Sequence, residues 1–132
     1  MPIDYLAVAV AAIVAIAFCW LYYWLLMKQW LAAAGLKEAD YKSGPPPLAW
    51  IFLVVGYLLA AWMLAAILLY VGTVSIRAGI IAGVLLWLGF TLPPIAINNV
   101  FAKRSLALTA IDAGGWLGSL VIMGAVIGAF GK

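Results

Sequence analysis

The chain has 132 residues, of which 70% are hydrophobic and 8% charged, and its formal net charge is +3. A soluble domain of this length could not bury so much apolar surface, because a small globule leaves much of its area in contact with water. The composition therefore excludes a soluble catalytic module and predicts one integral membrane domain over residues 1–132. The basic residues are scattered along the chain, so no nucleic-acid partner is expected.

Four apolar runs are long enough to cross a bilayer, which takes about 20 residues each. They are Leu6–Met27, Leu48–Val71, Ala78–Val100 and Leu106–Phe130. They predict an all-α, four-helix membrane bundle. The first run lacks the positive start of a secretory signal, so we expect it to be retained as a helix.

The first run begins with alanines and ends with aromatics. Ala7, Ala11 and Ala15 recur at four-residue spacing, which permits close approach of membrane helices. The run ends in "FCWLYYWLLMKQW", which is typical of an aromatic belt at the membrane interface. An aromatic cage for a lipid or ligand is the alternative. The single Cys19 excludes an internal disulfide.

The basic residues predict the orientation of the chain. The first and third connections carry five of the seven, and the opposite side carries Arg77 and Lys132. Because cytoplasmic loops are enriched in lysine and arginine, both termini are expected outside. The five are Lys28, Lys37, Lys42, Lys103 and Arg104.

The third run contains a proline pair in "WLGFTLPPIAINN". Pro93 and Pro94 lack backbone N–H groups, so a kinked or broken third helix is expected. The carbonyls near Gly89 and Phe90 would lose their usual donors, and the Thr91 hydroxyl is a candidate replacement.

The fourth run carries two GxxxG pairs, Gly114 with Gly118 and Gly124 with Gly128. Such pairs are typical of helix–helix contacts in membranes. At 100° per residue, Gly114, Gly118 and Gly128 share one face, and Asp112 lies nearly opposite. If both faces are used, one packs inside the bundle and the other meets a second copy or another subunit. A homo-oligomer or a membrane-protein complex is therefore expected.

Asp112, in "TAIDAGGWLG", is the one acid deep in a predicted span. It lies roughly 9 Å along the fourth helix, level with the proline pair. Two hypotheses follow. In the first, Asp112 anchors the fourth helix to a carbonyl freed by Pro93 and Pro94. In the second, it is a proton or cation site beside a broken helix. The candidate polar intramembrane residues are Asp112, Asn98, Asn99, Thr91 and Ser119.

Enzyme chemistry is poorly supplied by this composition. There is no histidine, which excludes a Ser-His-Asp triad and the usual zinc sites. Asp112 with Asn98 and Asn99 is too small a set for a metal-dependent lipid enzyme. No metal, cofactor or catalytic residue is expected.

Several residues and short motifs follow one another in a characteristic order: Trp20, Lys28, Trp30, Gly35-Leu36, "WLGF" at 87–90, Asn98, Phe101, Arg104, Leu106, Leu108, Ile111, Ala113-Gly114 and "VIMGAVIGA". This order resembles a bacterial membrane family, the domain of unknown function 1761. The resemblance spans nearly the whole chain and implies four membrane helices and an uncharacterised function. It assigns no catalytic residue. It also implies that asparagine is common at the position of Asp112, which suits a hydrogen-bonding anchor.

From these features together we expect a non-enzymatic protein of the bacterial inner membrane that binds lipids and other membrane components. A small proton-coupled transporter or channel is the alternative.

Overall fold

A computed structural model describes residues 2–41 and 44–131 of the chain. The described part is helical and contains four helices or helix runs long and apolar enough to cross a membrane. These spans are Tyr5–Leu25, Pro47–Val71, Ile76–Phe101 and Leu106–Gly131. The predicted all-α membrane-type bundle is therefore confirmed. Lys42 and Lys132, both used in the orientation prediction, lie outside the described residues.

The first span is helix α1 (Tyr5–Leu25), and a break at Leu26 separates it from α2 (Met27–Ala34). The first helix thus ends before the predicted Met27. The Asp4 carboxylate caps α1 by accepting from the Ala7 N–H at 3.1 Å. Helix α2 ends at Gly35, whose φ of 73° suits a residue without a Cβ. A short 3₁₀ turn, Glu38–Tyr41, follows.

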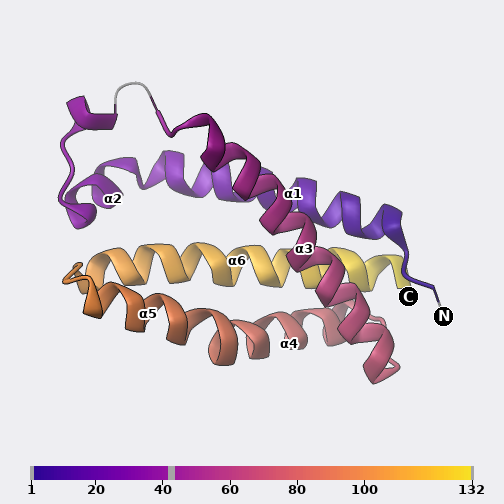
Figure 1. The fold of residues 1–132 in the computed structure, drawn as a ribbon. Helices are drawn as coiled ribbons and strands as arrows, with labels where there is room; N and C mark the ends of the chain where they lie inside the picture. Colours follow the sequence, from indigo (N-terminus) through magenta and orange to yellow (C-terminus); the bar gives the residue numbers. More distant parts are fainter. Residues whose placement is uncertain (1, 42–43, 132) are drawn as a thin grey trace.

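The second span is helix α3 (Pro47–Val71). Proline fits its first turn because that turn has no intrahelical acceptor for the missing N–H. The helix ends at Gly72, which has a φ of 93°. Figure 1 shows α3 crossing the other helices obliquely.

The third span is built from three segments, α4 (Ile76–Leu86), a π-helical turn η2 (Trp87–Thr91) and α5 (Leu92–Phe101). In the π turn the Leu92 N–H bonds the Trp87 carbonyl, five residues back. Pro93 and Pro94 follow at the start of α5, where they interrupt no hydrogen bond that α5 needs. The third span is thus interrupted by a π-helical turn directly before the proline pair, and the kink expected from the prolines stays a prediction.

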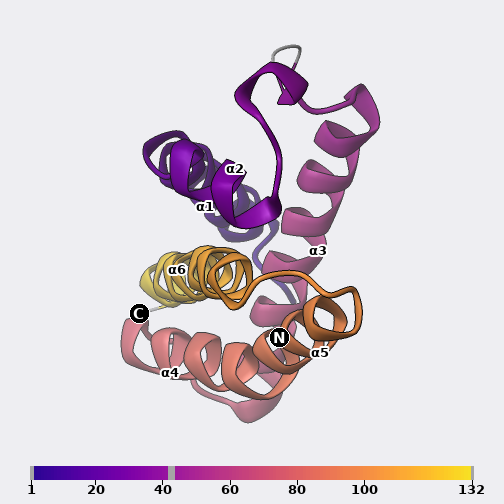
Figure 2. The ribbon, with the colours of Figure 1, turned by 90° about the vertical axis from the view of Figure 1, so that its left-hand side faces the viewer.

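The fourth span, helix α6 (Leu106–Gly131), is the centre of the bundle and the most buried of the four. It packs closely against α4 and α1, and also contacts α5 and α3. The view along the bundle in Figure 2 shows α6 between α1 and the α4–α5 span. The start of α1 and the end of α6 lie at one end of the bundle, and α2 lies with the α5–α6 connection at the other (Figure 1).

Small residues allow the helices to approach closely. A Cβ on Gly79 would collide with the backbone of Gly124, and a Cβ on Gly124 with that of Gly79. A Cβ on Gly128 would collide with the Ser75 backbone. The core between α1 and α3 contains Ala11, Ala15 and Ala61, which are fully buried. In lipid this close packing replaces the hydrophobic effect as the force between helices.

Candidate functional site at the Asp112 end of the bundle

Asp112 lies on α6 near the α2 end of the bundle, and its carboxylate is held by two donors from the N-terminal region. The Tyr23 hydroxyl donates to Asp112 Oδ1 at 2.8 Å, and the Trp30 indole N–H donates to the same oxygen at 3.2 Å. Tyr23 belongs to α1 and Trp30 to α2. The two rings meet edge to face, with centroids 6.5 Å apart. One carboxylate oxygen therefore joins three helices.

The partner predicted for Asp112 is wrong. Its hydrogen bonds go to Tyr23 and Trp30, and none joins it to a carbonyl near Pro93 and Pro94 within the described part of the chain. The physical reason is the rotation of α6. The next residue, Ala113, presents its carbonyl to the third span, where the Trp87 indole N–H donates to it at 2.7 Å. The side chain of Asp112 consequently faces α1 and α2.

The glycines beside Asp112 provide the space for these aromatic rings. The Tyr22 hydroxyl donates to the Ile111 carbonyl at 2.7 Å. A Cβ on Gly114 would lie 2.8 Å from that hydroxyl, and a Cβ on Gly115 would lie 3.1 Å from the Tyr22 ring. Glycine at both positions therefore lets α1 lie against the turn that carries Asp112.

The same contact corrects the expectation of two separate faces on α6. Gly118 packs against the Phe18 ring of α1, one turn from the contacts of Gly114. Gly124 and Gly128 pack against α4. All four GxxxG glycines thus face helices of the same chain, and none of them needs a second copy to cover it.

Asn99 joins a second polar group, at the connection between α5 and α6. Its side-chain N–H donates to the Thr109 hydroxyl at 3.0 Å, and Arg104 donates to its side-chain oxygen at 3.5 Å. The Arg104 backbone N–H also donates to the Asn99 carbonyl at 2.8 Å. These bonds close the turn that leads into α6.

Ser105 ties that turn to the first connection. Its hydroxyl oxygen accepts from the Leu108 N–H at 3.1 Å, which caps α6, and its hydroxyl donates to the Ala33 carbonyl at 2.7 Å. The α5–α6 connection is therefore held directly against the end of α2.

Ser119 lies apart from Asp112, in the centre of the core. Its hydroxyl is hydrogen-bonded to the Tyr57 hydroxyl of α3 at 2.8 Å, and the Tyr57 ring lies against the Trp116 ring with centroids 5.0 Å apart. This pair links α3 to α6 in the same way that Tyr23 links α1 to α6.

The remaining candidate residues do not join either group. Asn98 is exposed, and Thr91 is half-buried in the π turn. Neither takes part in a side-chain hydrogen bond to Asp112 or Ser119 among the described residues. Of the five predicted polar residues, Asp112 and Asn99 therefore lie in two separate groups of hydrogen bonds at this end of the bundle. Ser119 lies in a third group, in the centre of the core.

The aromatic donors Tyr22, Tyr23, Trp30 and Trp87 are not among the residues predicted from the sequence. The first three lie in "FCWLYYWLLMKQW", which as a whole is typical of an interface belt, and the fourth begins "WLGF". Trp20 and Trp24 do fit a belt, because they are exposed and stacked with centroids 6.3 Å apart. Tyr22 and Tyr23 turn inward, because neighbouring positions on a helix point to different sides.

The chemistry available at this end is hydrogen bonding. Within residues 2–41 and 44–131, no buried side-chain nitrogen or oxygen lacks a partner. In the same residues, no three His, Cys, Asp or Glu side chains are grouped so that they could hold a metal ion. The carboxylate acts as an acceptor that fixes α1 and α2 on α6.

Comparison with known proteins gives one family match. No curated protein and no solved structure matches the chain. The family described as "Protein of unknown function (DUF1761)" matches residues 6–128, which is nearly the whole chain and includes Asp112 with both of its donors. The chain therefore belongs to the DUF1761 family of proteins of unknown function.

Proposed function

We propose that this protein is a non-enzymatic integral membrane protein that acts by binding other membrane components, as an accessory or assembly subunit. The observation that carries this proposal is the pair of hydrogen bonds that Asp112 accepts. Its carboxylate accepts from Tyr23 and Trp30 and so serves to hold helices together. The polar interior is engaged in structural contacts, which leaves the outer surface as the part available for function.

The α4–η2–α5 span is the least buried of the four spans. Its large exposed side chains include Leu85, Leu88, Phe90 and Ile97. Since the GxxxG glycines are covered within the chain, an association between copies or with another subunit would use this span rather than the glycines of α6.

Gentle detergent extraction from native membranes, followed by native mass spectrometry, tests this function. A partner protein or a second copy present in stoichiometric amount is the expected result. A cysteine-crosslinking control in intact membranes, with Leu85→Cys in a Cys19→Ser background, detects complexes that detergent disrupts. Recovery as a bare monomer, with no crosslinked product in membranes, would overturn the proposal.

A second candidate function is a small proton-coupled transporter or channel that uses Asp112. It is favoured by an intramembrane acid on a helix that packs against a π-interrupted span. Asp112→Asn separates the two functions, because the amide oxygen can still accept hydrogen bonds while the side chain no longer titrates. A variant that folds normally but loses a measured proton-linked flux would favour transport.

Charge and family resemblance support a proposed orientation and membrane. The α2 end of the bundle carries four basic residues, Lys28, Lys37, Lys103 and Arg104. The opposite end carries Arg77, in the first turn of α4. We place the α2 end in the cytoplasm of a bacterial inner membrane, with both termini outside.

A further inference from the structure

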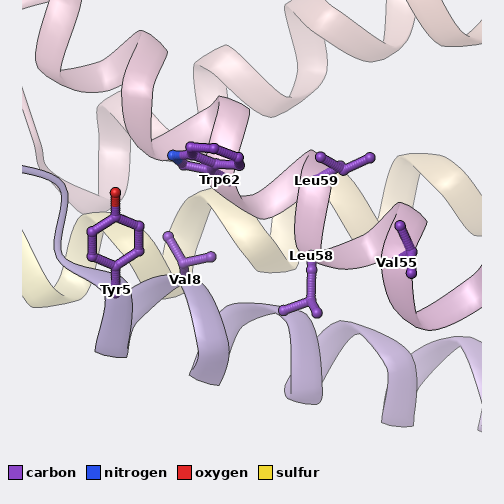
Figure 3. A pocket seen from close by; sticks show the side chains of 6 residues that line it. All are labelled: Tyr5, Val8, Val55, Leu58, Leu59 and Trp62. Carbon is purple, nitrogen blue, oxygen red and sulfur yellow. The ribbon is translucent and has the colours of Figure 1, made fainter.

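A cavity lies between α1 and α3, away from the Asp112 end. Its volume is about 320 Å³, and Figure 3 shows the six side chains that line it. Tyr5 and Val8 come from α1, and the others come from α3. The full set is Tyr5, Val8, Val55, Leu58, Leu59 and Trp62.

The walls of this cavity are apolar and open sideways. Val8 is buried at its base, while Val55, Leu58 and Leu59 are about half exposed. Both α1 and α3 are long and apolar enough to cross the membrane. The opening therefore faces the hydrocarbon of the bilayer rather than water.

Two hydrogen-bond donors lie at one end of the cavity. Figure 3 shows the Tyr5 hydroxyl at that end and the indole nitrogen of Trp62 on the edge of the ring nearest to it. Neither side chain is hydrogen-bonded to any residue within the described part of the chain. In hydrocarbon a donor without an acceptor costs free energy, so the Trp62 indole, which lies within the α3 span, favours an occupant that brings an acceptor. The Tyr5 hydroxyl, at the start of α1, can donate to the same acceptor.

The two donors restrict the occupant. A partner helix offers them no free backbone carbonyl, because its carbonyls are already bonded within the helix. An acyl chain is narrow and apolar, and the ester at its head is an acceptor.

From this geometry we propose that the cavity binds one acyl chain of a glycerophospholipid, with the ester carbonyl accepting from Tyr5 and Trp62. The depth is suitable, because Tyr5 is the first residue of α1 and so lies near the boundary between headgroups and hydrocarbon. The lining residues carry no charge. The site therefore selects the chain and its ester rather than the headgroup. It does not depend on the association function proposed above.

A photoactivatable phosphatidylcholine with a diazirine in the middle of one acyl chain tests the position of the lipid. The full-length protein is reconstituted with this probe, irradiated and mapped by mass spectrometry. Crosslinks concentrated at Val8, Val55 and Leu58 are expected. Equal labelling of Leu85 and Ile97 on the third span would show an ordinary annulus of lipid and would overturn the proposal.

Retention of phosphatidylethanolamine by the delipidated protein tests the hydrogen bonds. Tyr5→Phe with Trp62→Phe is expected to bind about tenfold more weakly in native mass spectrometry, because two donors are lost. The matched control is Tyr70→Phe with Trp50→Phe, which removes an exposed hydroxyl and an exposed indole outside the cavity. Phosphatidylglycerol should bind as well as phosphatidylethanolamine. Equal retention by both double variants, or a strong preference for one headgroup, would contradict the proposal.

Discussion

The Tyr23 hydroxyl donates to Asp112 Oδ1 at 2.8 Å, across 89 positions of the chain. The same oxygen also accepts from the Trp30 indole at 3.2 Å, so a single acid fixes both α1 and α2 to α6. Within a membrane each of these donors would otherwise lack an acceptor. The stability of the α2 end of the bundle should therefore depend on the accepting oxygen of residue 112 more than on its charge.

Replacing Asp112 by leucine should destabilise the protein, and replacing it by asparagine should not. Asp112→Leu leaves the Tyr23 hydroxyl and the Trp30 N–H without an acceptor, which costs about 1–3 kcal/mol per group. Asp112→Asn retains an oxygen that can accept both. Thermal unfolding in detergent, followed by size-exclusion retention, measures the difference. A variant Asp112→Asn as unstable as Asp112→Leu would show that the charge itself is required.

A double-mutant cycle should detect coupling between Tyr23 and Asp112. Tyr23→Phe and Asp112→Leu each break the 2.8 Å hydrogen bond, so their effects on the free energy of unfolding should not add. The expected coupling is about 0.5–2 kcal/mol, the range of hydrogen bonds in membrane proteins. Unfolding in mixed micelles measures it.

The control for this cycle pairs Asp112→Leu with Tyr57→Phe. The Tyr57 hydroxyl bonds Ser119 and not Asp112. The two effects should add within about 0.5 kcal/mol. Coupling of similar size in both cycles would mean that Asp112 acts on the bundle as a whole and not through Tyr23.

The buried pair of Tyr57 and Ser119 should show the cost of an unmatched polar group. Ser119 has no exposed surface, so Ser119→Ala removes its hydrogen bond to the Tyr57 hydroxyl, which is then left with only the Cys19 thiol, a weak acceptor, in the core. The expected loss is about 1–3 kcal/mol. Adding Tyr57→Phe removes the unmatched hydroxyl and should restore part of the stability. A double variant less stable than Ser119→Ala, measured by thermal unfolding, would contradict this account.

The number of spans could be predicted from the sequence because membrane helices require long apolar runs, and this chain has little else. The glycine spacing in α6 also indicated close helix contacts. The glycine spacing could not indicate which helix packs against which glycine, because α6 contacts several helices. A wheel drawn for one helix does not contain the positions of α1 and α4.

The partners of Asp112 were harder to predict for a related reason. The hairpin of the third and fourth spans places Asp112 level with the proline pair, and that proximity in sequence favoured the wrong partner. Tyr23 and Trp30 are more than 80 positions away. Their approach depends on the break at Leu26 and on the space left by Gly114 and Gly115, which only the folded chain shows.

The proposed orientation predicts different reactivity at the two ends of the bundle. In a Cys19→Ser background, Arg77→Cys should react with a membrane-impermeant maleimide added outside spheroplasts, because residue 77 lies with the termini. Lys103→Cys should react only after the membrane is opened. Both positions are exposed in the structure, so the side of the membrane on which each thiol lies determines the result. The reverse pattern would place the termini in the cytoplasm.

The contact between α4 and α6 should be the least tolerant of added volume. A Cβ at Gly79 would overlap the carbonyl oxygen of Gly124, and backbone cannot rotate away as a flexible side chain can. Gly79→Ala must therefore separate two helices that touch through their backbones. The expected cost is about 1–3 kcal/mol, as for overpacking of a core.

Gly56→Ala is the matched control, because Gly56 also lies within a membrane-spanning helix. A Cβ at Gly56 would meet nothing within 4 Å. Alanine is favoured over glycine in a helix by about 0.5–1 kcal/mol, so this variant should be as stable as the parent or slightly more so. Thermal unfolding of both variants in the same detergent measures the contrast. Equal stability of the two variants would mean that α4 and α6 do not touch at Gly79, and a loss at Gly56 would indicate that another molecule packs there.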